Sequence, residues 1–341
     1  MSSVPRSLLY EAAINEALHQ TMSADPSVFL IGQGVKSPWY VGNTCTDLIN
    51  KFGERRVIDT PVSENAITGA AVGASLAGMR AIVVHPRVDF LMYGLDPLVN
   101  EAANWHYMSG GRASVPVVLW GIINRGGEQA AQHSQSLHAW FAHVPGLKVV
   151  MPSTPYDAKG LLIAAIRDNN PVVYLPDRWL NGCTGPVPEE VFEVEIGKAA
   201  IRRAGTELTI VASSYVASES LKAAEELATR GIDAEVLDLR TIKPIDRAAI
   251  IASVRKTGRL LAVDGGWRSF GVSAEIAAIA AEHAFDALKA PVRRLALPDT
   301  PAPASRSLEH AYYKHAADIV DAACDMLGRG HKSKEQEVVQ E

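Results

Sequence analysis

Lys148-Val149-Val150-Met151-Pro152-Ser153, followed by a helical pattern from Pro155 to Arg167 and by Pro171-Val172-Val173-Tyr174-Leu175, is the stretch that decides the fold. Two apolar runs of strand length enclose a segment of helix length, and turn residues mark each boundary. Unbroken apolar strands that alternate with helices are typical of a parallel sheet covered on both faces. This stretch therefore predicts an α/β fold.

The same alternation extends along the chain in both directions. It predicts further strands at 27–32, 81–84, 116–120, 208–212, 234–239, 259–264 and 292–297, and helices at 8–25, 214–230 and 272–283. A glycine- and proline-containing segment with an acidic run interrupts the pattern before residue 200. We therefore predict two doubly wound domains with mainly parallel sheets: a first domain at 1–185, a linker at 186–200, a second domain at 201–328 and a disordered polar tail at 329–341.

Composition excludes several classes of function. The 341 residues are 48% hydrophobic and 21% charged with a net charge of -5, so we expect no nucleic-acid partner. Cys45, Cys183 and Cys324 are too far apart for a zinc site and fit a reducing compartment, which predicts a cytoplasmic protein. No apolar run reaches about 18 residues, so we expect no membrane span.

The stretch Asp59-Thr60-Pro61-Val62-Ser63-Glu64-Asn65-Ala66 puts the Glu64 carboxylate in a turn just before the small-residue segment 67–74, which predicts a closely packed helix. Burial there opposes the charge of Glu64, so this acid could bind a proton or give one up. The alternative is a structural acid in the first helical turn, stabilised by the helix dipole, with Ser63 as the cap. The local pattern leaves both interpretations open.

Polar and aromatic residues follow other predicted strand ends. His133 lies in a glycine-bearing loop flanked by amide side chains, which favours a functional role, whereas His138 and His143 are predicted to pack on a helix. Phe90 and Tyr93 could pack in the core or form a stacking surface for a heteroaromatic ring.

The helix predicted to end at Arg167 could expose carbonyl oxygens beside Asp168 and Asn170 to a monovalent cation, although most such ends are simply capped. The chain lacks the GxGxxG, GxxxxGK[ST], HExxH and GxSxG patterns of common nucleotide-binding, zinc-protease and serine-hydrolase sites. It also lacks the Gly-Asp-Gly and downstream Asn that mark a thiamine diphosphate and magnesium site.

The order of these segments resembles the β subunit of the E1 component of 2-oxoacid dehydrogenase complexes, a transketolase-like family that includes pyruvate, branched-chain and acetoin dehydrogenases. The resemblance runs from Tyr10 to about Leu327. Its most specific pieces are Arg56-Val57-Ile58-Asp59-Thr60-Pro61-Val62-Ser63-Glu64 and Ala131-Gln132-His133-Ser134-Gln135-Ser136. Further matching pieces include Ile166-Arg167-Asp168-Asn169-Asn170-Pro171-Val172 and Asp238-Leu239-Arg240-Thr241-Ile242-Lys243-Pro244.

The resemblance assigns roles to single residues. It implies that Glu64 bonds N1′ of the aminopyrimidine of thiamine diphosphate and promotes loss of the thiazolium C2 proton. It implies that Phe90 stacks on the aminopyrimidine and that His133 acts near the substrate during reductive acylation. It also implies a structural potassium site formed by Val117, Ala165, Ile166, Asp168 and Asn170.

The resemblance further implies that this chain is half of an enzyme. A separate α subunit would bind the diphosphate and Mg²⁺, and the two chains would form an α2β2 heterotetramer with the cofactor at their interface. The enzyme would decarboxylate a 2-oxoacid and pass the acyl group to a lipoyl-bearing E2. The alternatives are a thiamine-dependent carboligase, which passes the carbanion to an aldehyde or ketone, and a non-catalytic paralogue.

The chain departs from the family pattern around the predicted site. Gln33 replaces an acid near the cofactor, Tyr93 replaces a common glutamine, and we expect both to line the cofactor. His85 and Gly265 also differ from the family. Arg87 could bind an extra anionic group on the substrate or, alternatively, pair with Asp89 on the surface. These changes leave the substrate and the acceptor open.

Overall fold

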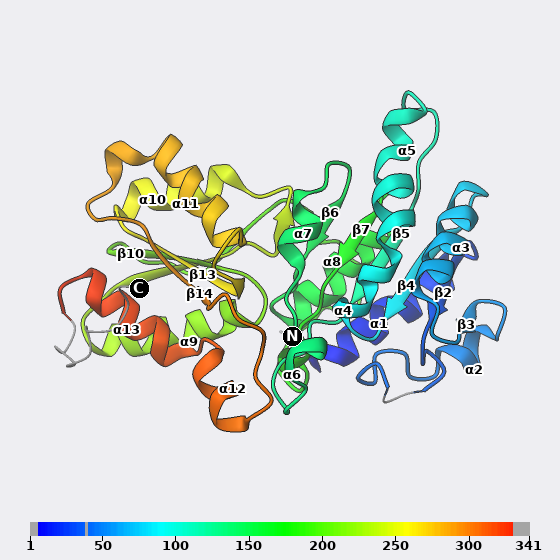
Figure 1. Ribbon diagram of the computed structural model, residues 1–341, viewed down its shortest axis with the longest axis horizontal. Helices are drawn as coiled ribbons and strands as arrows, with labels where there is room; N and C mark the ends of the chain where they lie inside the picture. Colours follow the sequence, from blue (N-terminus) through cyan, green and yellow to red (C-terminus); the bar gives the residue numbers. More distant parts are fainter. Residues whose placement is uncertain (1–5, 38–39, 330–341) are drawn as a thin grey trace, which may run out of the picture.

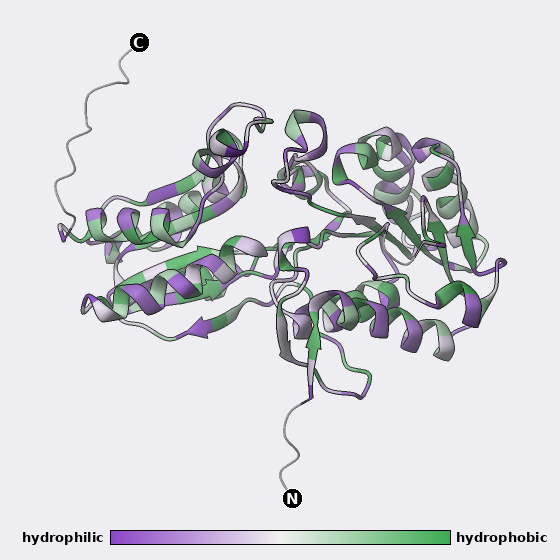
Figure 2. Ribbon diagram, turned by 90° about the horizontal axis from the view of Figure 1, so that it is seen from below, coloured by the Kyte–Doolittle hydropathy of each residue, from purple (hydrophilic) through white to green (hydrophobic). Residues whose placement is uncertain are grey.

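The computed structural model describes residues 6–37 and 40–329 and folds them into two α/β units that lie side by side (Figure 1). All of the predicted tail except Arg329 lies outside the described residues. In each unit a sheet of largely apolar strands lies between helices with mixed polar and apolar faces (Figure 2). Within the described ranges, each helix is too short or too polar to cross a membrane.

The first unit is built on a seven-stranded sheet in the described part of the chain, ordered β12-β6-β7-β5-β4-β2-β3. Neighbouring strands are parallel except for β12, which runs antiparallel to β6. The strands are β2 Val28–Gly32, β3 Val57–Asp59, β4 Arg80–His85, β5 Val117–Gly121, β6 Lys148–Val150, β7 Val172–Tyr174 and β12 Thr241–Lys243.

The second unit has a five-stranded sheet within the described ranges, ordered β14-β13-β10-β11-β9, with only β9 antiparallel to its neighbour. A two-stranded ribbon of β1 and β8 lies outside both sheets. These strands are β1 Ser7–Leu9, β8 Thr184–Pro186, β9 Ala200–Arg203, β10 Leu208–Ala212, β11 Ala234–Asp238, β13 Leu260–Trp267 and β14 Arg293–Leu297.

Helices cover both faces of each sheet, as predicted for doubly wound domains. One face of the first sheet packs on α1, α2 and α8, and the other packs on α3, η2, α5 and α7. In the second unit, α9 and α13 cover one face and α10 and α11 the other. The helices are α1 Tyr10–Ala24, α2 Leu48–Phe52, α3 Glu64–Leu76, α4 Val88–Leu91, η1 Met92–Gly94, η2 Asp96–Ala102, α5 Ala103–Met108, α6 Ala130–His133, α7 His138–His143, α8 Pro155–Arg167, η3 Arg178–Leu180, α9 Tyr215–Thr229, α10 Arg247–Thr257, α11 Val272–His283, η4 Phe285–Ala287, α12 Arg306–Tyr312 and α13 Ala316–Met326.

The strand–helix–strand unit at 148–175 forms as predicted. Thr154 caps α8 by accepting a hydrogen bond from the Asp157 N–H, and Pro155 occupies the first turn, where its missing N–H costs little. Because α8 is buried on nearly all sides, its Lys159 is buried too. The Lys159 ammonium is compensated by Glu16 at 2.6 Å and by backbone carbonyls.

The predicted boundary at 186–200 does not separate the two sheets completely. After β11 the chain returns to the first sheet, where β12 pairs with β6 before α10 begins. A three-residue strand with a register shift carries too little periodicity to be predicted from the sequence. Helix α1 also begins later than predicted, because residues 7–9 form β1 instead.

Buried polar contacts join the two units. Arg125, which follows β5, donates from Nε to Asp177 at 2.7 Å and from a terminal nitrogen to the Gly265 carbonyl at 2.8 Å. His138 Nε2 lies 3.0 Å from Asp264 Oδ1, and both side chains are buried. The prediction that His138 is an ordinary packing residue was therefore incomplete, because this ring connects α7 to β13.

Burial alone would raise the pKa of the Asp264 carboxyl, but its contacts outweigh that effect. The His138 ring and the N–H groups of Gly266 and Ser273, both near 3 Å, hold the pKa of Asp264 below its ordinary value. Asp264 therefore remains an anionic acceptor between the two units at neutral pH.

We predict that Asp177→Asn lowers the thermal unfolding midpoint strongly. The substitution leaves the Arg125 guanidinium buried without a counter-charge, which costs on the order of 3–5 kcal/mol. The matched control is Asp286→Asn, which breaks the exposed Arg255–Asp286 pair of 2.9 Å and should change the midpoint little. Equal midpoints for the two variants in differential scanning calorimetry would contradict this account.

Candidate active site

The candidate site lies where the chain changes direction across the first sheet. From β2 the chain passes through α2 to β3 on one side, and then through α3 to β4 on the other side of β2. The helices α2 and α3 consequently cover opposite faces. In open parallel sheets, ligands bind outside the carboxyl ends of the strands at such a switch point. Gln33 follows β2 at this edge, and His85 ends β4.

Glu64 begins α3 at this edge and is 8% exposed. Ser63 is the N-cap residue by position, but its hydroxyl donates to the Val62 carbonyl and leaves the helix uncapped by a side chain. Within the described ranges, the Glu64 carboxylate receives no hydrogen bond from protein. The predicted close packing of α3 is present, because a Cβ at Gly94 would lie 2.5 Å from Thr68 Oγ1.

His85 is fully buried beside Glu64, and its Nε2 lies 3.3 Å from the Thr68 hydroxyl. Burial lowers the pKa of His85 to about 4, although the charge of Glu64 acts in the opposite direction. The imidazole is therefore neutral at pH 7. It does not form an ion pair with Glu64.

The structure brings Phe90 and His133 together. Their rings meet edge to face, with centroids 5.2 Å apart and planes at 85°. The Gln135 N–H donates to Asp89 Oδ1 at 3.0 Å, which holds the segment after β5 against the segment after β4. His133 was predicted in a loop, but it is the last residue of the one-turn helix α6.

Several buried polar atoms at this edge have no hydrogen-bond partner in the described part of the chain. Burial raises the pKa of the Asp89 carboxyl, against the opposing effect of the Gln135 N–H. Buried donors and acceptors without partners are costly, so their concentration here indicates a place for a ligand or a partner subunit. These atoms are Gln33 Nε2, Thr60 Oγ1, His85 Nδ1, Arg87 Nε, Asp89 Oδ2 and Ser134 Oγ.

The arrangement fits an aromatic, protonatable heterocycle such as an aminopyrimidine. Glu64 offers a carboxylate without a donor, and the partly exposed Phe90 offers a ring surface. Gln33 is buried at the end of β2, whereas Tyr93 is 73% exposed on η1. Among the described residues, no group of three or more His, Cys, Asp or Glu side chains is placed to hold a metal ion.

The predicted potassium site lies at the carboxyl end of α8, where the protein supplies cations of its own. Arg80 donates to the carbonyls of Ile166 and Asp168 at 3.1 and 3.0 Å, and Lys148 pairs with the Asp168 carboxylate. The same carboxylate accepts the Asn170 N–H at 2.9 Å. A potassium ion would have to share these oxygens with Arg80. The ligand set of Val117, Ala165, Ile166, Asp168 and Asn170 stays a prediction.

Thr68 and Gln129 were not predicted as site residues. Thr68 lies one helical turn after Glu64, so the spacing placed it on the same face of α3, but the pattern does not distinguish it from a core residue. No sequence pattern could have identified Gln129, because its contact with Arg87 joins two segments that are distant in the sequence.

Two family models match the chain. The model described as "Transketolase, pyrimidine binding domain" matches residues 6–180, which contain the whole candidate site. The model described as "Transketolase, C-terminal domain" matches residues 197–319.

Relatives match nearly the whole chain. It is 44% identical over 326 residues to the pyruvate dehydrogenase E1 component subunit beta-2 of Oryza sativa subsp. japonica, covering 94% of this chain and 87% of the relative. It is also 44% identical over 328 residues to the acetoin:2,6-dichlorophenolindophenol oxidoreductase subunit beta of Cupriavidus necator, covering 93% and 97%.

A solved structure described as "Split gene transketolase, inactive beta4 tetramer" is similar in fold, with a TM-score of 0.75 and 21% identity over 95% of this chain and 99% of that one. The two family models agree with the two-unit architecture. The chain therefore belongs to the transketolase-like family of 2-oxoacid dehydrogenase E1 β subunits.

Proposed function

We propose that this chain supplies the proton-handling half of a thiamine diphosphate site, and that with an α subunit it decarboxylates a 2-oxoacid and transfers the acyl group to a lipoyl-bearing E2. The observation that carries the proposal is the buried Glu64 carboxylate at the switch point, which has no donor from the described protein. A ligand that places a protonatable ring nitrogen there would satisfy it.

Bound thiamine diphosphate would supply a nucleophilic carbon and accept the electron pair released when CO2 leaves the 2-oxoacid. Glu64 would hold a proton on the aminopyrimidine N1′, and Phe90 would orient that ring by stacking. The neutral His85 leaves the Glu64 carboxylate free for this bond, since an imidazolium in the same place would compete for it.

An α subunit in an α2β2 heterotetramer would complete the site. Val62 precedes the Glu64 turn and Tyr93 lies on η1, which packs on α3, and each of the two side chains is 73% exposed. Exposed apolar side chains beside a site that lacks a diphosphate motif support a subunit interface here. We also propose that the α subunit binds Mg²⁺ and that a K⁺ ion binds at the end of α8. We propose a cytoplasmic location for the assembly.

We predict that Glu64→Gln abolishes C2-proton exchange of the bound cofactor in the αβ complex, because an amide cannot hold the N1′ proton. Loss of such acid–base catalysis lowers rates by about 10²–10⁴-fold. Nuclear magnetic resonance would measure the exchange, and 2-oxoacid-dependent ferricyanide reduction would measure turnover. Glu226→Gln, on the distant helix α9, is the matched control. Unchanged exchange in Glu64→Gln would overturn the assigned role.

We further propose that His133 acts in the transfer to lipoate. Opening the lipoyl disulfide leaves the acyl group on one sulfur and requires a proton on the other. The partly buried His133, held against Phe90, can donate that proton. Ferricyanide accepts electrons without this proton transfer, so the two acceptors separate the steps.

We predict that His133→Gln lowers acylation of an isolated lipoyl domain by about 100-fold while ferricyanide reduction falls much less. Mass spectrometry of the domain measures acylation, and His283→Gln on α11 is the control. Equal losses with both acceptors would contradict this role. An unmodified lipoyl domain with the unaltered enzyme would favour the carboligase over the dehydrogenase.

A further inference from the structure

Arg87 occupies the loop that leads from β4 into the site. Its side chain is partly buried, and its terminal nitrogens donate to the Pro86 carbonyl at 2.9 Å and to Gln129 Oε1 at 3.2 Å. Its Nε is buried and has no partner in the described part of the chain. The alternative that Arg87 pairs with Asp89 on the surface is wrong, because Asp89 is buried and accepts the Gln135 N–H instead.

A second arginine, the exposed Arg178, lies in the loop after β7. The Arg178 N–H donates to the Ile123 carbonyl at 2.9 Å, while the Val88 N–H donates to the Ile122 carbonyl at 2.9 Å. The two consecutive carbonyls after β5 thus hold the segments that carry the two arginines. Burial lowers the pKa of Arg87, and the positive charge of Arg178 lowers it further.

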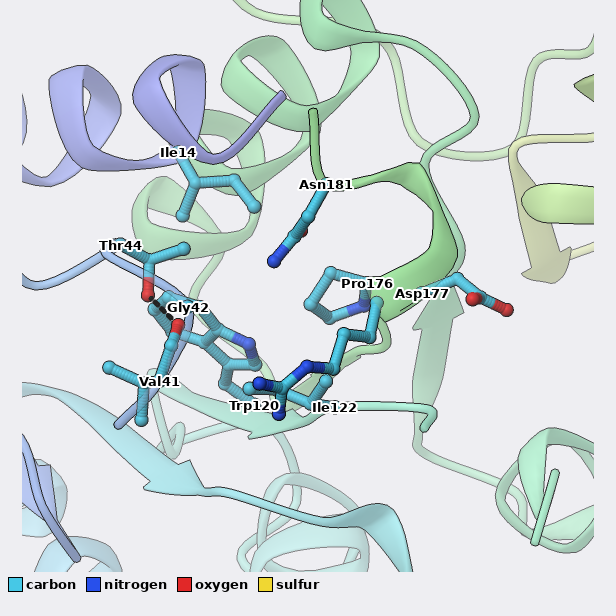
Figure 3. A pocket seen from close by; sticks show the side chains of 10 residues that line it. Ile14, Val41, Gly42, Thr44, Trp120, Ile122, Pro176, Asp177 and Asn181 are labelled. Carbon is cyan, nitrogen blue, oxygen red and sulfur yellow. Dashed lines mark hydrogen bonds between the residues drawn. The ribbon is translucent and has the colours of Figure 1, made fainter. Parts of the chain in front are cut away.

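Neither guanidinium has a carboxylate within ion-pair distance among the described residues. Like charges on neighbouring segments repel, and an anion bound by both arginines would relieve that repulsion. Arg178 also lines a small cavity with Trp120, Ile122 and Pro176, and Val41 lines the same cavity (Figure 3). Among the residues that the structure describes, the buried Trp120 Nε1 has no hydrogen-bond partner either.

The two arginines belong to the same edge as the reacting groups. Arg87 lies three residues before Phe90, and its partner Gln129 directly precedes the short helix that ends at His133. An anion held by Arg87 would therefore be attached to a molecule within reach of the Glu64 and His133 chemistry.

We propose that Arg87 and Arg178 form a subsite for a second anionic group, a carboxylate or a phosphate, on the carbonyl substrate of this enzyme. This proposal rests on the proposed function for the identity of the substrate, but the anion site itself can be tested without turnover. Guanidinium forks bind carboxylates and phosphates through paired, charge-assisted hydrogen bonds.

Binding of inorganic phosphate to the cofactor-loaded αβ complex, measured by isothermal titration calorimetry, tests the site directly. We expect Arg87→Gln and Arg178→Gln each to weaken the affinity by about tenfold or more, since each removes charge-assisted hydrogen bonds. Arg87→Lys keeps the positive charge but not the planar guanidinium fork. Its affinity for phosphate should therefore lie between that of Arg87→Gln and that of the unaltered complex. The control is Arg112→Gln, at an exposed arginine whose side chain, among the described residues, bonds the Ser109 carbonyl alone, and this variant should bind phosphate as the unaltered complex does. Equal affinities in all variants, or no binding, would overturn the proposal.

Matched substrates identify the molecule that carries the anion. The donor pair is 2-oxopentanoate and 2-oxoglutarate, and the acceptor pair is glyceraldehyde and glyceraldehyde 3-phosphate with pyruvate as donor. In Arg87→Gln and Arg178→Gln, we expect kcat/KM to fall about tenfold or more for the charged compound of either the donor pair or the acceptor pair, and to change little for its neutral counterpart. The pair that responds shows which substrate carries the anion. An unchanged charged-to-neutral ratio in both pairs would overturn the subsite.

The two proposals fail in different ways. If the complex turns over no 2-oxoacid while phosphate binding depends on both arginines, the proposed function fails and the anion subsite stands. If neutral 2-oxoacids react while phosphate binding is independent of both arginines, the subsite fails and the proposed function stands.

Discussion

The parallel pairing of β2 and β4 is the constraint on which the rest of the structure depends. Parallel strands place their carboxyl ends at one edge, and the opposite directions of the two connections make that edge the switch point of the sheet. Glu64 lies at this edge because the turn before α3 ends there, and His85 lies there because it is the last residue of β4. A carboxylate and a neutral imidazole thus meet because of the topology, without any motif that joins them in the sequence.

The second unit holds the loop after β5 in place. Arg125 bonds the Gly265 carbonyl, the Gly126 N–H donates to the Tyr313 hydroxyl at 3.4 Å, and the Glu128 N–H donates to Glu309 at 3.0 Å. These contacts precede His133 by a few residues. The position of His133 against Phe90 therefore depends on both units, which explains why a site formed by one sheet requires a two-unit chain.

The sequence predicted the elements whose patterns are local and missed features that depend on tertiary contacts. The segment 148–175 was predictable because its strands are apolar throughout and its helix has a cap and a proline in the first turn. Strand β12 was not, because three residues pairing outside their own unit carry no periodicity. Glu64, Phe90 and His133 came from the ordered family pattern. The neutral state of His85 and the neighbouring positions of the segments that carry Arg87 and Arg178 depend on burial and on the packing of distant loops, which no local pattern records.

The central claim is that this chain forms one wall of an active site and cannot hold the cofactor alone. Isothermal titration calorimetry of thiamine diphosphate with Mg²⁺, into the chain alone and into the chain with its α partner, tests it most directly. We predict saturable binding only in the presence of the α subunit, because the sequence lacks the Gly-Asp-Gly pattern and no side-chain cluster among the described residues is placed to hold the metal. Equal affinity for the isolated chain would contradict the account.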